Sequence, residues 1–339
     1  MEHPAGAQTV EAPKVFSVAQ IDASCRMPLL LLFVSGATWL LIGTFLGLIA
    51  SIKFHGPGFV AGSAWLTLGR IRPAGMNALV YGFAVQSFLG ILTWIICRLG
   101  RIPLLGQRAT FAGGVMWNAA VTLGVLGILA GRSSGFELLE MPRIVPPLLF
   151  VGFSIITVCA LVTFHFRRDP DLYVSHWFLL GALFWFVWIY SASVLLLLYF
   201  PVRGVMQAVT DAWYVGNLSQ LWFGAAGLGI AFYFIPKLLD RPLRTSTMAA
   251  FAFWMLALFA PWSGLARLIG GPVPAWMLKF QEAYSSRNML VGLAQALVFP
   301  GRAGKIEADG RPISYWMLIK NFTAALFPFV SDVAISAAV

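Results

Sequence analysis

The chain has 339 residues, of which 59% are hydrophobic and only 11% are charged, and its mean hydropathy is +0.82. These values exclude an ordinary soluble domain and indicate an integral membrane protein. The formal net charge of +10 does not indicate nucleic-acid binding, because the basic residues stand singly or in small groups between apolar runs.

Residues 1–27 are polar or mixed, and they show no small-residue cleavage pattern after a short apolar core. We interpret them as an N-terminal tail and not as a cleaved signal peptide. The three cysteines, Cys25, Cys97 and Cys159, are widely separated and form no C-x-x-C pair. Their spacing predicts neither a zinc site nor a disulfide framework.

Seven apolar runs are long enough to be transmembrane helices, since about 20 residues are needed to cross roughly 30 Å of hydrocarbon. The runs are 28–52, 73–97, 109–130, 146–164, 177–200, 212–235 and 247–269. The later segments 289–300 and 313–330 are shorter or interrupted by polar residues and Pro328. The sequence therefore predicts an all-α, polytopic membrane bundle of seven helices, with one or two further candidate spans.

Basic residues in the loops favour a cytoplasmic N-terminus, because Lys and Arg are enriched on the cytoplasmic side. That side would hold Arg98, Arg101, Arg108, Arg167, Arg168, Lys237, Arg241 and Arg244. The opposite face would hold Lys53, Arg70, Arg72, Arg132, Arg143 and Arg203.

The stretch "AWLTLGRIRPAGMNALVYGF" at 64–83 resembles the second transmembrane helix of the catalytic subunit of heme-copper oxidases, above all the C-family or cbb-type cytochrome c oxidases. In that family an Arg-Pro pair is followed two residues on by a histidine, an axial ligand of the low-spin heme, and then by Asn-Ala. Arg72-Pro73 and Asn77-Ala78 are present here, but Gly75 stands where the resemblance places the ligand.

Two further stretches resemble the copper-binding helices of the same family. In "WYVGNLSQLWFGAAGLGIAFYFIPK" at 213–237, the ungapped match places Gly216 at a copper-ligating histidine and Asn217 at the asparagine after it. In "FWMLALFAPWSGLARLIGG" at 253–271, Ala266 and Arg267 stand where the family has a histidine pair on copper. The resemblance thus implies four vacated ligand positions: Gly75, Gly216, Ala266 and Arg267.

Segments 117–131, 135–143 and 161–185 are also similar to helices and loops of this subfamily. The resemblance covers roughly 28–277 and implies a helical bundle of the heme-copper oxidase subunit I type. We therefore expect three parts: the tail 1–27, the bundle 28–277, and a divergent or truncated C-terminal segment 278–339.

The chain has four histidines, His3, His55, His165 and His176, and none lies in the middle of a predicted span. We interpret them as residues of the tail and the membrane interface; the alternative is a heme held by His55 from outside the helices. Met76 could serve as an axial ligand, but adjacent helical positions point about 100° apart, so we expect it to pack instead.

We also expect the charged residues near the predicted spans to have structural roles and not to bind a cofactor. Arg70 and Arg72 could pair with heme propionates, but we expect them to anchor the helix end and to bind a lipid phosphate or a partner's carboxylate. We expect Arg267 to reach toward the interface. The acidic residues Glu137, Glu140, Asp169, Asp171, Asp211 and Asp240 are expected in loops or at helix ends, with no proton path through the membrane.

The resemblance implies a membrane subunit of a cbb-type cytochrome c oxidase-like respiratory complex in the bacterial inner membrane, beside other oxidase subunits and cytochrome c-like proteins. The family uses heme and copper to pass electrons from cytochrome c to oxygen. The missing histidines predict that this chain binds no heme, copper or other metal, and that it is a structural paralogue without catalysis of its own. Composition alone leaves a small-solute transporter or channel component as the alternative.

Overall fold

The computed structural model describes residues 16–238, 246–268, 270, 271, 273, 276, 306–308 and 311–313. Its α-helices are α1 (Val18–His55), α2 (Leu68–Asn77), α3 (Gln86–Gly100), α4 (Gln107–Leu129), α5 (Val145–His165), α6 (Val174–Val194), α7 (Val205–Gly216), α8 (Phe223–Leu238) and α9 (Ser246–Phe259). Wider π-helical segments are η2 (Ala78–Val85), η3 (Leu195–Tyr199) and η4 (Asn217–Trp222). Short 3-10 turns are η1 (Ala64–Leu66), η5 (Ala260–Trp262) and η6 (Leu265–Leu268).

Within these residues, six helical stretches are long and apolar enough to cross a membrane, which confirms the first six predicted runs. They are Val18–His55, Leu68–Gly100, Gln107–Leu129, Val145–His165, Val174–Tyr199 and Val205–Leu238. Two of them are continuous helices that pass from α geometry through η2 or η4 and back to α geometry. The chain is a multi-pass membrane protein of helical-bundle architecture.

The seventh predicted run, 247–269, is not one long helix. Helix α9 has 14 residues, which at 1.5 Å per residue gives about 21 Å, less than the roughly 30 Å of a hydrocarbon core. It gives way to 3-10 turns at Ala260, because Pro261 cannot continue the α-helical hydrogen bonding and Gly264 adopts a φ of +93°. The candidate span 289–300 lies outside the described residues, and of 313–330 only Ile313 is described.

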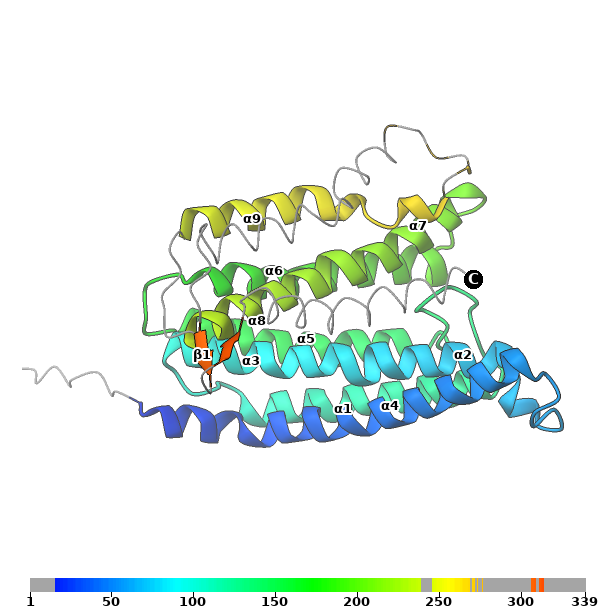
Figure 1. The fold of residues 1–339 in the computed structure, drawn as a ribbon, viewed down its shortest axis with the longest axis horizontal. Coiled ribbons are helices and arrows are strands. Elements are labelled where there is room, and N and C mark those ends of the chain that lie inside the picture. The colour runs from blue at the N-terminus through cyan, green and yellow to red at the C-terminus, as the bar shows by residue number, and fades with distance from the viewer. Residues whose placement is uncertain are drawn as a thin grey trace, which may run out of the picture.

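The helices lie side by side as nearly parallel rods, with α1 along the lower edge and α9 along the upper edge of Figure 1. Helices α4 and α5 approach closely through glycines. A Cβ at Gly152 would lie 3.2 Å from both Gly113 O and Trp117 N. Aromatic side chains fill the centre, where Phe153 stacks on Phe186 with a 4.0 Å centroid distance.

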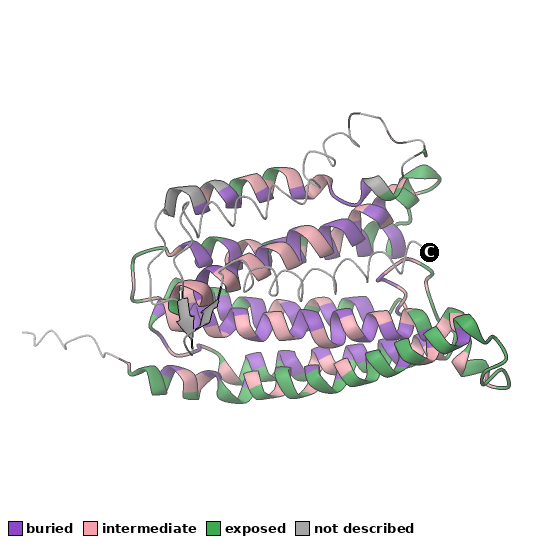
Figure 2. Cartoon of the chain, in the orientation of Figure 1, coloured by how far each residue is buried: buried purple, intermediate pink, exposed green. Residues whose placement is uncertain are grey.

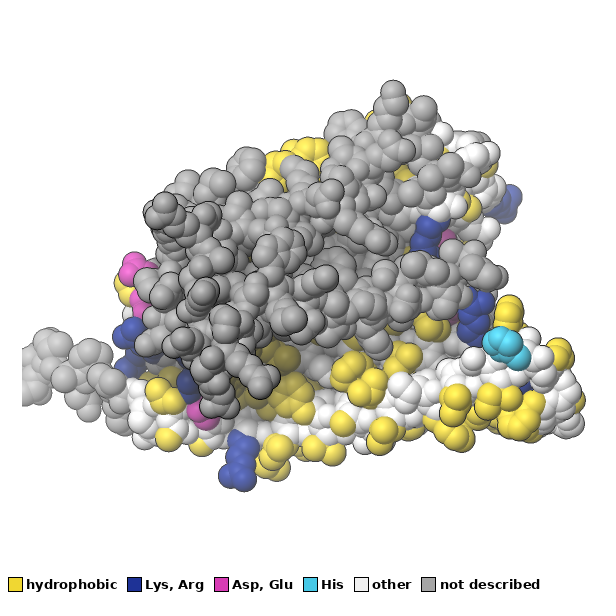
Figure 3. Space-filling model, in the orientation of Figure 1, with side chains coloured by type: hydrophobic (Ala, Val, Ile, Leu, Met, Phe, Trp, Pro, Cys, Tyr) yellow, Lys and Arg dark blue, Asp and Glu magenta, His cyan; other side chains and the backbone are white. Residues whose placement is uncertain are grey.

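The outer face of α1 is apolar and exposed. Leu41 is 71% exposed, Phe45 is 62% exposed and Phe54 is 65% exposed, and Figure 2 shows this helix largely green along the lower edge. In Figure 3 hydrophobic side chains lie along the length of the molecule, whereas Lys and Arg gather toward its two ends. A helix with such a face is stable in lipid, where apolar side chains need no cover from water.

The structure adds a small element that the all-α prediction lacks. Strands β1 (Ile306–Ala308) and β2 (Arg311–Ile313) pair antiparallel, with Ile306 opposite Ile313 and Ala308 opposite Arg311.

Candidate functional site

Gly75 lies buried in α2 against the backbone of α1. A Cβ added there would lie 3.3 Å from Gly43 O, 3.3 Å from Leu46 Cβ and 3.4 Å from Gly47 N. These distances are at or below the short limit of ordinary van der Waals contact, so the two helices touch through their glycines. A histidine side chain at this position would require α1 to move away.

Gly216, the last residue of α7, lies against the turn between η5 and η6. A Cβ at Gly216 would collide with the backbone of Ser263 and Gly264, and one at Gly264 would collide with Ala212 O. Gly264 also has a φ of +93°, which side chains of L-residues rarely tolerate. The structure thus brings together the two segments that the resemblance connects with copper, and backbone atoms occupy the space between them.

Hydrogen bonds to one carbonyl hold this contact in place. Pro261 O accepts from Trp213 Nε1 at 2.9 Å and from Asn217 Nδ2 at 3.2 Å. Asn217 Nδ2 also donates to Trp213 O at 2.8 Å. Because α7 and η4 supply both donors, they are fixed to the turn that follows α9.

Arg267 in η6 forms an ion pair with a loop carboxylate. Its Nη1 lies 2.6 Å from Glu137 Oε2, and both side chains are 31% exposed. The sequence led us to expect that Arg267 reaches toward the interface; its guanidinium is partly exposed and pairs with Glu137 in the loop before α5. The side chain of Ala266, which precedes it, is not among those described.

Asp211 is placed differently from the sequence expectation. It lies within α7, because this helix begins at Val205 and not at residue 212. Its Oδ1 is buried without a hydrogen-bond partner in the described part of the chain. An acidic group therefore lies inside one of the six observed membrane-length helices, Val205–Leu238, and outside the predicted run 212–235.

A second polar network lies between α2, η2 and the same loop. Asn77 Nδ2 donates to Glu140 Oε2 at 2.7 Å, and the hydroxyl of Tyr81 donates to Leu138 O at 2.6 Å. The hydroxyls of Tyr81 and Tyr214 also hydrogen-bond to each other, which joins η2 to α7. Burial raises the pKa of Glu140 to about 7, and the hydrogen bond from Asn77 opposes the rise.

The two spans that carry Gly75 and Gly216 share a buried asparagine at the start of a π-helical segment. Asn77 ends α2 and Asn217 begins η4, and each donates its side-chain amide to the carbonyl four residues earlier, at 2.8 Å in both cases. Both asparagines are fully buried, and a π-helical segment follows α2 and α7 at these points. Single π turns occur often at functional positions of helices, and no periodicity in the sequence indicated them.

The weaker candidates do not converge on a common site. His55 is the exposed last residue of α1, and its Nδ1 lies 3.0 Å from Ser51 O in the same helix. Arg70 donates to Leu129 O at 3.3 Å and packs against Gly131, so it ties α2 to the end of α4. Arg72 is exposed at the same end of α2. Met76 packs against the core as expected.

His176 was expected at the interface, but the structure buries it. It lies in the first turn of α6, is 1% exposed, and contacts the ring of Phe164 at a 5.3 Å centroid distance. Neither ring nitrogen has a hydrogen-bond partner among the described residues. His165, the last residue of α5, is exposed as expected, and His3 lies outside the described residues.

The comparison with protein families settles the affiliation of the chain. Residues 28–325 match the family described as cytochrome c and quinol oxidase polypeptide I. The chain belongs to this family. The match to polypeptide I extends past residue 277, where the recognisable motifs end; the three-part division of the chain stays a prediction.

Curated relatives of this chain belong to the cytochrome c oxidases that the motifs resemble. The chain is 24% identical over 246 residues to a cytochrome c oxidase subunit 1 homolog of Azorhizobium caulinodans, covering 70% of this chain and 45% of the relative. It is 25% identical over 255 residues to cytochrome c oxidase subunit 1 of Rhodobacter capsulatus, covering 70% and 47%. It is 25% identical over 253 residues to the Cbb3-type cytochrome c oxidase subunit CcoN1 of Stutzerimonas stutzeri, covering 70% and 52%. The chain spans about half the length of these relatives.

The residues that stand at the family's ligand positions in this chain cannot bind heme iron or copper. Glycine at 75 and 216 supplies no donor atom, and the direction of a side chain at either position is filled by neighbouring backbone. The guanidinium of Arg267 stays protonated, so it has no lone pair for a metal ion, and it is already paired with Glu137. Proteins hold heme iron and copper mainly through imidazole, thiolate or thioether groups, and neither contact offers one.

Proposed function

We propose that this chain is a membrane subunit of a cbb-type cytochrome c oxidase-like respiratory complex, in which it acts as a structural paralogue without heme or copper of its own. The observation that carries the proposal is the contact between Gly216 and Gly264, since backbone atoms fill the space that a copper ligand would need. The ion pair between Arg267 and Glu137 supports it, because a protonated guanidinium that is paired with a carboxylate cannot act as a metal ligand.

The remaining features of the proposal rest on the family, on the basic residues of the loops and on the exposed face of α1. The subunit would lie in the bacterial inner membrane with its N-terminus in the cytoplasm, packed against ligand-bearing oxidase subunits that exchange electrons with cytochrome c-like proteins. The apolar outer face of α1 would contact lipid. Transfer of electrons from cytochrome c to oxygen would belong to the partners and not to this chain.

The test is a reduced-minus-oxidised optical spectrum of the tagged chain, first purified with its partners and then separated from them. We expect heme bands in the assembly and none that remain stoichiometric with the isolated polypeptide. Heme bands that stay with the isolated chain would overturn the structural-paralogue role. A purified assembly without any heme would overturn membership in an oxidase complex.

Histidine substitutions test the packing argument directly. Gly75→His and Gly216→His would restore an imidazole at two aligned positions, yet we expect both variants to lose stability and to gain neither heme nor copper. Gly224→His is the matched control, because a Cβ at Gly224 would meet only Leu256 Cδ1 at 3.9 Å. Acquisition of heme or copper by Gly75→His or Gly216→His with unchanged stability would contradict the proposal.

A further inference from the structure

Two cysteines that are far apart in the sequence meet at one end of the bundle. Cys25 lies near the start of α1 and Cys97 near the end of α3, and both are 0% exposed. They belong to one small apolar cluster of four buried side chains, together with Ile21 and Leu104. The spacing in the sequence gave no sign of this pair.

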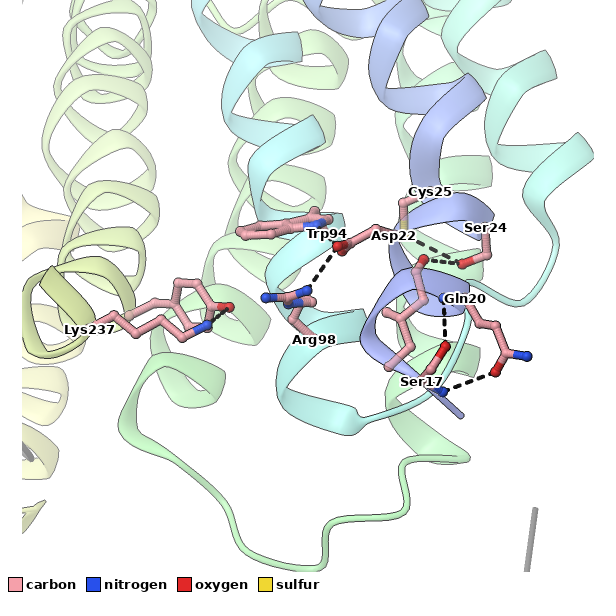
Figure 4. A network of polar contacts seen from close by, with 10 residues as sticks. Ser17, Gln20, Asp22, Ser24, Cys25, Trp94, Arg98 and Lys237 are labelled. Carbon is pink, nitrogen blue, oxygen red and sulfur yellow. Dashed lines mark hydrogen bonds and ion pairs between the residues drawn. The ribbon is translucent and has the colours of Figure 1, made fainter. Parts of the chain in front are cut away.

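Polar contacts one turn away fix the register between the two helices. Asp22 accepts a hydrogen bond from Trp94 Nε1 at 2.9 Å and forms an ion pair with Arg98 at 2.9 Å. Asp22 precedes Cys25 by three residues and Trp94 precedes Cys97 by three residues, so each pair is stacked along its own helix. Figure 4 shows Asp22 directed toward Trp94 and Arg98, with Cys25 beside it on α1.

The loop after α3 adds a further restraint. Leu104 N donates to Ser24 Oγ at 2.9 Å, and Ser24 Oγ lies 3.7 Å from Cys25 Sγ. Side chains of α1 thus tie this helix both to α3 and to the segment that follows it. Helix α1 also starts with a capping box formed by Ser17 and Gln20, which keeps its first turn regular.

We propose that Cys25 and Cys97 form a redox modification site, in which a low-molecular-weight disulfide converts the two thiols into an internal disulfide between α1 and α3. One cysteine thiolate attacks a sulfur of the oxidant RSSR, which forms a mixed disulfide and releases one RSH. The other cysteine thiolate then attacks the protein sulfur of the mixed disulfide and releases the second RSH. The two thiol protons and two electrons leave with the two RSH molecules.

The position of the pair gives the oxidant a route to buried sulfur atoms. Cys25 is the eighth residue of α1 and Cys97 is the fourth residue from the end of α3, and the end regions of helices open locally at a lower free-energy cost than their centres. Once formed, the bond would close a loop on the order of 70 residues, which restricts the unfolded chain strongly. The helices would then stay joined at this end even when the polar contacts break.

Cys159 provides an internal control. It is buried in α5, where its Sγ lies 3.7 Å from Gly106 O, and it belongs to neither the cluster nor the network around Cys25. A Cys159→Ser variant therefore removes one thiol and leaves the proposed site intact.

The experiment treats the purified full chain in detergent with oxidised glutathione, quenches exchange with acid, and alkylates the remaining thiols under denaturing conditions. Intact mass should show alkylated thiols falling from three to one in the natural chain and from two to none in Cys159→Ser. Peptide mapping should identify a Cys25–Cys97 link, and dithiothreitol should reverse it. Cys25→Ser and Cys97→Ser should form no internal link.

Two results would overturn the proposal. One is retention of all three alkylatable thiols in the natural chain, and of both in Cys159→Ser, at a glutathione poise that oxidises a model dithiol peptide. The other is stable glutathione adducts on Cys25 or Cys97 in place of the internal link. Because the natural chain and Cys159→Ser keep the pair intact, the outcome does not depend on whether the two serine variants fold.

Discussion

Replacing Gly216 by alanine is expected to destabilise the protein, although alanine is the better helix former. In an open helical position this change gains about 1 kcal/mol. At Gly216 the added methyl group would collide with the backbone of Ser263 and Gly264, which cannot rotate away as a side chain could. Overpacking costs about 1–3 kcal/mol, and a clash with backbone lies toward the upper end.

Gly224→Ala is the matched control, because it lies in the same continuous span and its Cβ would meet only Leu256 Cδ1 at 3.9 Å. Both variants share the gain in helix propensity, so they should differ by the overpacking cost, roughly 1–3 kcal/mol. For a chain of this size that corresponds to a difference in midpoint on the order of 2–4 °C. Thermal unfolding in detergent, followed by size-exclusion chromatography of the remaining folded protein, measures it. Equal midpoints for the two variants would refute the close contact.

Three further tests use substitutions at Arg267 and Glu137, at Glu140 and at His176. Arg267→Gln should lower the free energy of unfolding by about 1 kcal/mol or less, because the ion pair is partly exposed. The double variant with Glu137→Gln should be no less stable than Arg267→Gln alone. If the losses of the two single variants add up in a double-mutant cycle, the ion pair does not contribute. Since the pKa of Glu140 is raised from 4.5 to about 7, stability should be greatest below about pH 4.5 and fall until about pH 7. Glu140→Gln should remove this slope in pH-dependent melting, and an unchanged slope would assign it elsewhere. His176→Phe should be neutral or stabilising by about 1–3 kcal/mol, because it removes two unpaired buried nitrogens; a clear loss of stability would mean that the imidazole has a partner.

The hydrophobic runs predicted the membrane architecture well, because a backbone in hydrocarbon must form long uninterrupted helices. Six of the seven predicted spans are present. The seventh failed because Pro261 and Gly264 end α9 early, and a run of apolar residues does not by itself reveal the effect of such breakers. The helices also begin or end up to about ten residues beyond the apolar runs, since polar residues extend a helix at the membrane surface.

The candidate site was predictable only in part. The resemblance identified Gly75, Gly216, Ala266 and Arg267 as positions of interest, but it could not show that backbone atoms occupy the space in front of the two glycines. Such contacts depend on helix packing and leave no local pattern in the sequence.

Pairs that join distant parts of the chain were not predictable either. The ion pair between Glu137 and Arg267 and the thiol pair of Cys25 and Cys97 each connect residues far apart in the sequence. A single sequence carries no signal for such neighbours. Burial of His176 was missed for the same reason, because its place near a helix end favoured an interfacial interpretation.

The central claim, that this polypeptide holds no heme iron or copper, is tested most directly by elemental analysis of the isolated chain. The protein should be produced with ample heme and copper, separated from its partners, and measured by inductively coupled plasma mass spectrometry against quantitative amino-acid analysis. We expect iron and copper far below one atom per polypeptide. One atom of either metal per chain, retained after chelation and gel filtration, would contradict the account.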